Sequence, residues 1–373
     1  MQLVIERGEL LRALGHVTSV VERRTTIPIL SNVQMRAGEA GVELKATDLE
    51  REVIEMAPAS VSTPGALTVP AHVLHDIVRK LPDGAQVELK RDGEGERLTL
   101  SSGRSRFALQ TLPADDFPDL SPGEMSHHFD ISASDLKRLI DKTRFAISTE
   151  ETRYYLNGIY LHPAENEEGE PTLRAVATDG HRLAQVDLAL PASASEMPGI
   201  IIPRKTVGEL HRLIEAGGGD IKVSVSEAKI RFQIADITLT SKLIDGRFPD
   251  YGRVIPKGND KVMHVSNALF MGAVDRVATI ASERNRAVKL SIASDKLILS
   301  VINPEGGSAT EEIGVTYESE GLEIGFNAKY LLDISNQLES DDAHFMLADS
   351  NSPTMVRDKG DGSALYVLMP MRV

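Results

Sequence analysis

The sequence predicts an α+β fold built from three copies of one unit, near residues 1–125, 126–253 and 254–373. Helix-like segments recur along the chain at nearly constant spacing, which indicates internal repetition. The stretches between them alternate apolar and polar residues, as antiparallel strands buried on one face do. A chain of 373 residues is also longer than one core usually organises. Each unit is therefore expected to pack two helices on an antiparallel sheet.

The second helix of each unit has the clearest signature. A short apolar stretch leads to a start signal at Pro70, Pro203 or Asn327, and apolar residues then follow at helical spacing. The three signals stand at nearly equal intervals along the chain. We predict helices over 70–81, 203–215 and 327–339, which share an acidic column at Asp76, Glu209 and Asp333.

The first helix of each unit is predicted over 8–24, 134–149 and 267–286. Two shorter motifs return one repeat later, both with the same displacement: Ala46-Thr47-Asp48 as Ala177-Thr178-Asp179, and Phe117-Pro118-Asp119 as Phe248-Pro249-Asp250. Period-two alternation predicts strands at Gln86–Lys90, Leu98–Leu100 and Ile221–Val225.

Composition narrows the class of protein. The chain has no cysteine, which excludes disulfides and thiolate metal sites. It has no long apolar run that could span a bilayer and no signal-peptide pattern, so we expect a cytoplasmic protein without a membrane partner. Its 41 Lys and Arg against 55 Asp and Glu give a net charge of −14, which at first argues against a nucleic-acid partner.

Motifs for catalysis and metal binding are missing or incomplete. Gly93-Glu94-Gly95 lacks the third glycine of a dinucleotide-binding loop. The pairs His72 with His75 and His127 with His128 lack a third ligand at a usual spacing. We therefore predict no cofactor, no metal site and no catalytic residue.

The nearest approach to a catalytic pair is Asp179 with His181. The alternative is that Asp179-Gly180 forms a tight turn between two strands. The first repeat favours the turn, since it has Thr47-Asp48 and no histidine.

The end of the chain, Tyr366 to Val373, is apolar and rich in methionine. Tyr366 to Leu368 suit an edge strand, whereas Pro370 cannot continue a ladder. Met369 and Met371 offer the adaptable apolar surface that holds varied peptides. A core strand and a binding surface remain equally open on these residues alone.

Several long motifs occur in a fixed order, and with them the whole chain resembles the bacterial DNA polymerase III beta-subunit family, the beta sliding clamps. The motifs are Arg24-Thr25-Thr26-Ile27-Pro28-Ile29-Leu30, Arg153-Tyr154-Tyr155-Leu156-Asn157-Gly158, Ala177-Thr178-Asp179-Gly180-His181-Arg182-Leu183, Ser241-Lys242-Leu243, Asp245-Gly246-Arg247-Phe248-Pro249-Asp250-Tyr251 and Met369-Pro370-Met371-Arg372.

The resemblance implies the DNA clamp fold and a head-to-tail homodimer that closes into a ring around double-stranded DNA. It implies a non-catalytic processivity factor of the DNA polymerase III holoenzyme, located in the cytoplasm at the nucleoid. The implied partners are the polymerase alpha subunit, the clamp-loader delta subunit and other proteins with short Gln/Leu/Phe-type motifs. Such a ring tethers its partners at high effective concentration and reads no base sequence.

The resemblance also implies three sets of residues. The DNA contacts are Arg24, Arg153, Tyr154, Tyr155, Arg204 and Lys205. The partner-peptide pocket comprises Leu156, Thr178, Gly180, His181, Arg182, Leu183, Pro249, Arg253, Val254, Asn327, Tyr330, Val367, Leu368, Met369, Pro370, Met371 and Arg372. The dimer interface comprises Phe107, Leu109, Ile280 and Ala281.

This sequence departs from the family pattern at a few positions. They are Glu150 and Glu151, Asn351, Pro353 and the segment from Glu283 to Arg286. An alternative for Tyr154 and Tyr155 is that one of them packs in the core, because strand neighbours face opposite sides.

The charge can be divided between the predicted helices and the rest. The six predicted helices hold 16 Lys or Arg and 11 Asp or Glu, a net +5, which leaves −19 elsewhere. Basic helices on an acidic body suit a ring whose lining attracts phosphate. Two other functions remain as alternatives: an enzyme that uses Asp179 and His181, and an acidic repeat scaffold that binds peptides without DNA.

Overall fold

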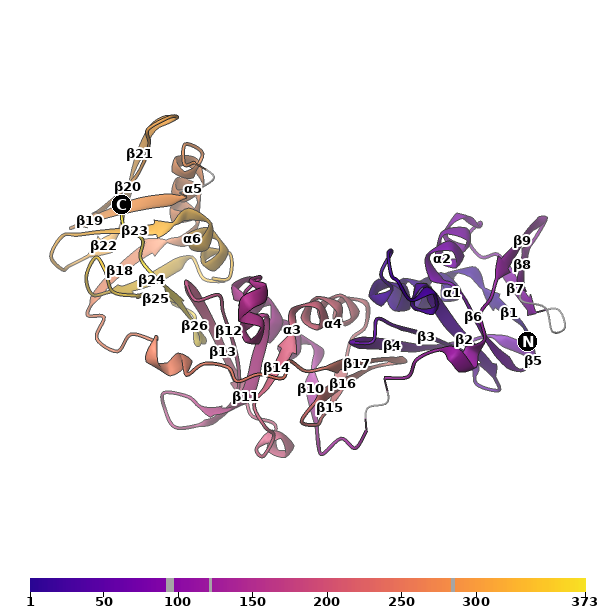
Figure 1. Cartoon of the computed structure of the whole chain (residues 1–373). Coiled ribbons are helices and arrows are strands. Elements are labelled where there is room, and N and C mark those ends of the chain that lie inside the picture. Colours follow the sequence, from indigo (N-terminus) through magenta and orange to yellow (C-terminus); the bar gives the residue numbers. More distant parts are fainter. Residues whose placement is uncertain (92–96, 121–122, 283–285) are drawn as a thin grey trace. The chain divides into compact units, whose positions relative to one another are not determined.

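The computed structural model describes residues 1–91, 97–120, 123–282 and 286–373. These form two compact units (Figure 1). Unit 1 comprises Met1–Ser134, Pro191–Met197 and Lys205–Leu243. Unit 2 comprises Asp135–Leu190, Pro198–Arg204 and Ile244–Val373.

Unit 1 is built around two antiparallel sheets. One has the order β5 (Ser60–Thr63), β1 (Gln2–Glu6), β7 (Gln86–Arg91), β8 (Arg97–Ser102), β9 (Ser105–Gln110). The other has the order β10 (His127–Ser132), β15 (Asp220–Val225), β16 (Lys229–Ile234), β17 (Ile237–Lys242), β4 (Arg51–Ala57), β3 (Gly41–Thr47), β2 (Asn32–Gly38), β6 (Gly65–Pro70). The strands predicted near residues 86, 98 and 221 are confirmed.

Unit 2 also holds two antiparallel sheets. The larger has the order β14 (Ile200–Pro203), β11 (Gly158–Glu165), β12 (Pro171–Thr178), β13 (Arg182–Ala189), β26 (Asp361–Leu368), β25 (Thr354–Asp358), β24 (Asp342–Leu347), β18 (Lys261–Ser266), β22 (Thr316–Tyr317). The smaller has the order β21 (Gly307–Gly314), β20 (Lys296–Asn303), β19 (Ala287–Ala293), β23 (Leu322–Asn327). Residues Val288, Leu290 and Ile292 of β19 alternate into the core.

The described residues contain six α-helices and seven short 3₁₀ segments. The α-helices are α1 (Arg7–Val17), α2 (Ala71–Lys80), α3 (Ala133–Thr143), α4 (Arg204–Ala216), α5 (Asn267–Ala278) and α6 (Ala328–Ser335). The 3₁₀ segments are η1 (Thr18–Val20), η2 (Pro28–Ser31), η3 (Ala114–Asp116), η4 (Arg144–Ala146), η5 (Glu151–Leu156), η6 (Ala192–Ala194) and η7 (Tyr251–Arg253). Helix α1 packs against α2, and α5 packs against α6.

The predicted helix starts at Pro70, Pro203 and Asn327 are confirmed, because α2, α4 and α6 begin at the next residue. Asn327 caps α6 directly: its side-chain oxygen accepts a hydrogen bond from the Lys329 backbone N–H at 2.9 Å. In α2, Ala71, Leu74 and Val78 are buried at helical spacing, as amphipathic packing requires.

The predicted ends of four helices are wrong, because α1, α3, α5 and α6 stop before residues 24, 149, 286 and 339. Three of them end at a threonine whose hydroxyl donates to the carbonyl four residues earlier. The bonds are Thr18 to Leu14 O, Thr143 to Leu139 O and Thr279 to Asp275 O. Each hydroxyl shares the carbonyl that the threonine's own N–H binds in a helix, and such side-chain bonds back to the helix weaken it locally. Residues 283–285 of the fifth predicted helix lie outside the described residues, as do Gly93-Glu94-Gly95.

Sheets join successive repeats. In unit 1, β17 of the second repeat pairs with β4 of the first, with Leu239 opposite Val53. In unit 2, β26 of the third repeat pairs with β13 of the second, with Val367 opposite Leu183. The three-repeat α+β architecture is thus confirmed, while the exact boundaries near residues 125 and 253 stay a prediction.

Candidate functional site

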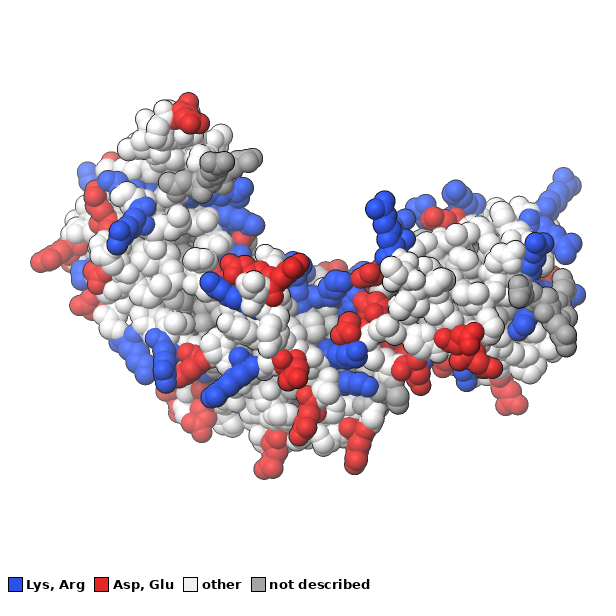
Figure 2. Space-filling view, in the orientation of Figure 1, with Lys and Arg blue, Asp and Glu red and all other residues white. Residues whose placement is uncertain are grey.

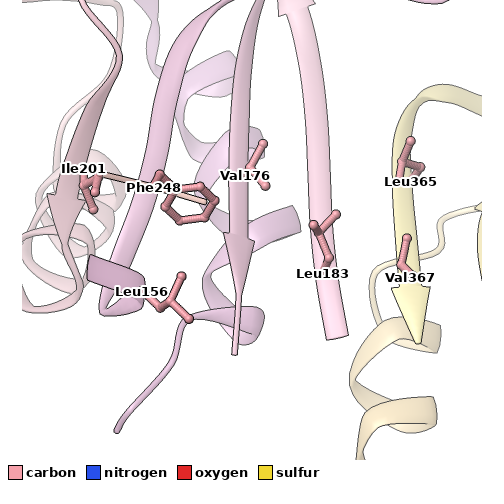
Figure 3. Packing of buried hydrophobic residues seen from close by; sticks show 7 residues of the cluster. All are labelled: Leu156, Val176, Leu183, Ile201, Phe248, Leu365 and Val367. Carbon is pink, nitrogen blue, oxygen red and sulfur yellow. The ribbon is translucent and has the colours of Figure 1, made fainter. Parts of the chain in front are cut away.

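A buried apolar cluster lies in unit 2 where β13 meets β26 (Figure 3). Its members are at most 7% exposed: Leu156, Val176, Leu183, Ile201, Phe248, Leu365 and Val367. Tyr155, Tyr160, Ile244, Tyr251 and Ile255 pack against it. Burial of this aliphatic and aromatic surface holds the strands of two repeats together. Three predicted pocket residues, Leu156, Leu183 and Val367, belong to this cluster.

The turn between β12 and β13 forms one border of this region. Gly180 has a φ of +89°, a conformation that favours glycine. The Thr178 hydroxyl donates to Arg182 O at 2.7 Å, and an Asp179 carboxylate oxygen accepts from the His181 N–H at 2.9 Å. The Asp-Gly turn is therefore confirmed. The Asp179 carboxylate binds the backbone N–H groups of His181 and Arg182 and the Arg182 guanidinium, as expected of a turn and not of an Asp-His catalytic pair.

Arg182 links this turn to α6. Its side chain is almost buried and contacts Asp179 at 3.1 Å and Asp333 at 2.5 Å. It also donates to Phe145 O at 2.5 Å, and its guanidinium carbon lies 4.3 Å from the centre of the Tyr330 ring. Because a planar guanidinium donates along several directions, one side chain fixes elements of both repeats.

The end of the chain follows β26 and is held at two points. The strand reaches Leu368, so Tyr366–Leu368 form a strand as predicted. The predicted edge position is wrong, because β26 pairs with β13 on one side and with β25 on the other. The Met369 N–H then donates to His181 O at 2.8 Å, and the Met371 N–H donates to Gly325 O at 2.8 Å. Met369 is 39% exposed, so part of its apolar side chain faces solvent.

The other predicted pocket residues differ in their surroundings. Pro249, Arg253 and Val254 lie exposed in or next to η7, where Arg253 pairs with Asp250 at 2.8 Å. Asn327 caps α6. The structure thus brings together the turn, the cluster and the tail. Of η7, Tyr251 packs against the cluster, while the predicted residues Pro249, Arg253 and Val254 are exposed.

A polar hollow of about 340 Å³ brings together residues from two of the predicted sets. It is lined by Arg204 of the DNA set and by His181, Arg182 and Tyr330 of the pocket set. Sequence reasoning missed Arg144, Phe145 and Lys329, which also line it, since no motif marks them. Burial raises the pKa of Tyr330, and the nearby Asp179 carboxylate raises it further.

The predicted DNA contacts are mostly at the surface. Arg24 is exposed between η1 and η2 and lies outside the helix predicted for it. Arg204 is exposed at the start of α4, and Lys205 pairs with Glu22 at 3.0 Å. Arg153 contacts Glu150 at 3.2 Å, so the acidic departure at Glu150 gives this arginine a local counter-charge.

Tyr154 and Tyr155 lie in the 3₁₀ segment η5 and not in a strand, so the strand setting assumed for them is wrong. Their environments nevertheless differ as the core alternative predicts: Tyr154 is 53% exposed, and Tyr155 packs against the buried cluster. Their rings meet edge to face with centroids 5.7 Å apart. Of the two, Tyr154 therefore offers the largely free ring.

The predicted interface residues sit at sheet and helix ends. Phe107 and Leu109 lie on β9, with Phe107 half-buried and Leu109 packed into its own sheet at 8% exposure. Ile280 and Ala281 follow α5 and are half-buried.

Charge is unevenly divided between helices and the rest of the chain. The six α-helices of the described residues carry twelve Lys or Arg and eight Asp or Glu, a net +4. Since the whole chain carries −14, the remainder carries −18. Figure 2 shows acidic side chains interspersed with basic ones over the visible face. Among the described residues, no group of three or more His, Asp or Glu is arranged to hold a metal ion.

Comparisons with known proteins cover the whole chain. Three family models match: the N-terminal, central and C-terminal domains of the DNA polymerase III beta subunit, at residues 1–121, 130–250 and 252–372. The beta sliding clamp of Caulobacter vibrioides is 53% identical over 373 residues, and that of Escherichia coli K12 is 41% identical over 374, each with 100% of both chains covered.

Solved structures agree with these matches. A sliding clamp from Bartonella birtlesii bound to griselimycin has a TM-score of 0.97 and 52% identity, with 100% of both chains covered. The clamp from Caulobacter crescentus has a TM-score of 0.96 and 53% identity, again with 100% of both covered. With every repeat matched by its own family model and relatives that align over their full length, the chain belongs to the DNA polymerase III beta-subunit family, the beta sliding clamps.

Proposed function

We propose that two copies of this chain close head to tail into a ring around double-stranded DNA, and that the ring tethers replication and repair proteins through the pocket beside the tail. The protein is a DNA sliding clamp, a non-catalytic processivity subunit of DNA polymerase III. The observation that supports the ring most strongly is the antiparallel pairing of strands between successive repeats.

Both joints within the chain follow one rule. The final strand of a repeat, β17 or β26, pairs antiparallel with the strand β4 or β13 of the preceding repeat. The final strand of the first repeat is β9, so under this rule β9 should pair with the strand of another repeat that corresponds to β4. In the third repeat that strand is β21. Both β9 and β21 are end strands of their sheets. A second copy supplies the partner for each, and a repeated head-to-tail contact of this kind can close a ring.

The charges of these two strands are complementary. Arg106 on β9 is exposed, and Arg104 is exposed in the turn before it. On β21, Glu312 is exposed and Glu311 is half-buried beside Arg276. Opposite charges across paired strands stabilise the pairing and fix its partner. Phe107 lies on the same strand face as Leu109 and adds apolar surface, with Ile280 and Ala281 as its proposed neighbours.

Light scattering tests the ring. We expect a mass of about 81 kDa, twice 40.6 kDa. Arg106→Glu should shift the protein toward monomer, whereas Lys222→Glu, a charge reversal at an exposed position of β15, should leave the mass unchanged. A wild-type monomer at micromolar concentration would contradict the proposal.

The proposed DNA contacts are Arg24, Arg153, Tyr154, Tyr155, Arg204 and Lys205. Exposed arginines and lysines bind phosphates without reading bases, so the ring can move along the duplex. The net positive charge of the helices supports this, as does the exposure of Arg24, Tyr154 and Arg204.

Retention on circular DNA is the decisive measurement. The loaded clamp should stay on a closed circle and leave after linearisation, because only topological linkage depends on DNA ends. Equilibrium binding to short linear duplex should weaken in the double variant Arg24→Ala/Arg204→Ala. The exposed Lys257→Ala serves as the matched control and should bind as the wild type does. Equal retention on circular and linear DNA would refute the encircling ring.

The proposed partner site combines the buried cluster as floor with the tail and the β12–β13 turn as walls. Its occupants are short peptides with Gln/Leu/Phe-type motifs from the polymerase alpha subunit, the clamp-loader delta subunit and other clamp-binding proteins. Leucine or phenylalanine side chains would bind the apolar surface, while backbone groups orient the peptide. We place this activity in the cytoplasm at the nucleoid. Among the described residues, no helix is long and apolar enough to cross a membrane.

A further inference from the structure

The last residues of the chain lie against one specific position of β23. The Met371 N–H donates to Gly325 O at 2.8 Å, and Met371 forms an isolated antiparallel bridge with Gly325. The other hold on the tail is the bond from the Met369 N–H to His181 O. The segment Met369–Met371 is thus fixed at both of its ends, by elements from two different repeats.

Gly325 provides the space that this arrangement requires. A Cβ atom at this position would overlap Val373 Cγ1 and would lie 2.6 Å from Met371 O. Real Cβ atoms essentially never approach other atoms this closely, and Met371 O belongs to the backbone. The backbone of Gly325 is not in the left-handed region, so any residue could adopt it. The tail therefore requires a glycine at position 325 because a side chain would not fit there, and not because the backbone needs a special conformation.

The position of the tail matters for the shape of the surface around it. Met371, Arg372 and Val373 line a hollow of about 810 Å³ together with Gly325 and Asn351. Without the bond at Met371, the segment after Leu368 would keep a single anchor at His181. A segment held at one end samples many conformations, and ordering it on binding costs free energy.

We propose that Gly325 is a positioning residue for partner peptides: its missing side chain seats Met371–Val373 and so holds Met369 and Met371 as a preformed wall of the partner pocket. This inference rests on the proposed peptide-binding function. Gly325 itself contacts the tail and needs no contact with the peptide.

The test compares Gly325→Ala with the matched control Gly362→Ala. Gly362 lies in β26 of the same unit, and a Cβ there meets nothing within 4 Å. The first readout is the rate at which carboxypeptidase releases Val373, followed by mass spectrometry, which reports tail seating without any peptide. The second is the affinity for a fluorescent peptide carrying a Gln/Leu/Phe-type motif. We expect faster release and roughly tenfold weaker binding, which is about 1.4 kcal/mol, for Gly325→Ala only.

Deletion of Met371–Val373, which removes both residues that a Cβ at position 325 would overlap, distinguishes seating from a general defect. If Gly325 acts through the tail, the deletion alone should weaken peptide binding, and adding Gly325→Ala should weaken it little more. Fully additive losses, or wild-type release and affinity in Gly325→Ala, would overturn the inference. Failure of the wild type to bind any such peptide would refute the proposed function, while the release rates would still report on the seat.

Discussion

Replacing Arg182 with methionine tests how the two walls of the proposed pocket are held together. The substitution keeps an apolar stem of similar length but removes the guanidinium. Asp179 and Asp333 then lose their shared partner, and Phe145 O loses a donor. The Tyr330 ring also loses the cation that lies 4.3 Å from its centre.

The expected loss can be worked from these contacts. Removing one partner of a buried ion pair costs about 3–5 kcal/mol. Here the side chains of Asp179 and Asp333 are 16% and 25% exposed, so water recovers part of that cost. We therefore expect about 2 kcal/mol from the carboxylates. The cation–π contact adds about 1 kcal/mol, for a total of about 3 kcal/mol.

Native-state hydrogen exchange is the suitable assay, because a chain of several domains need not unfold in one step. At about 3 kcal/mol, amides of β13 and α6 should exchange roughly 150-fold faster when local opening limits exchange. Arg182→Lys keeps the charge but not the planar fork, and it should show an intermediate effect.

Arg253→Met is the matched control for Arg182→Met. Its pair with Asp250 is at the surface, with side chains 84% and 65% exposed, so exchange should hardly change. Exchange in Arg182→Met within threefold of the wild type would refute the idea that this guanidinium links the two walls.

Three further predictions concern acid sensitivity and the tail. Although burial opposes it, hydrogen bonds from the Ser340 hydroxyl and from the N–H groups of Glu339, Gly360 and Ser340 hold the pKa of Asp358 at about 2. The ionised Asp358 carboxylate therefore stabilises the folded state by about 2 kcal/mol above pH 4, and this contribution is lost between pH 4 and 2. Asp358→Asn should lower the urea midpoint at pH 7 and not at pH 2. Burial lowers the pKa of His344, and the adjacent His264 lowers it further. The unfolded state therefore binds a proton at this histidine more readily than the folded state does, and the free energy of unfolding should fall as the pH drops below about 6.5. His344→Gln should reduce the change in urea midpoint between pH 7 and 5, and an unchanged difference would contradict this assignment. Deleting Met369–Val373 should abolish stimulation of the polymerase while light scattering still reports a dimer, and undiminished stimulation would exclude the tail from the pocket.

Local patterns in the sequence predicted much of the fold. The starts of α2, α4 and α6 follow Pro70, Pro203 and Asn327, because these residues favour the first turn of a helix through φ or side-chain capping. The turn at Asp179-Gly180 was likewise predictable from its residue types and its copy in the first repeat. The ends of α1, α3 and α5 were missed, although the threonines that bind back to the helix were visible, because apolar periodicity continued beyond them.

Local sequence patterns did not predict all the residues of the proposed partner site. Resemblance pointed to the turn, the cluster and the tail, but not to Arg144, Phe145 and Lys329, which reach the polar hollow from separate elements. Gly325 gave no signal either, because in the sequence it is an ordinary glycine near the end of a strand. The role proposed for Gly325 depends on Val373, which approaches so closely that a side chain at position 325 would not fit.

The sequence by itself determined the three repeats, the alternation of their strands, the starts of their second helices and the division of charge between helices and the rest. All of these depend on residues close together in the chain or on comparison of one repeat with another. Tertiary structure decided which strands join the repeats, which carboxylates Arg182 binds and where the tail lies. Those outcomes depend on packing between residues far apart in the sequence, for which space and hydrogen-bonding partners exist only once the chain has folded.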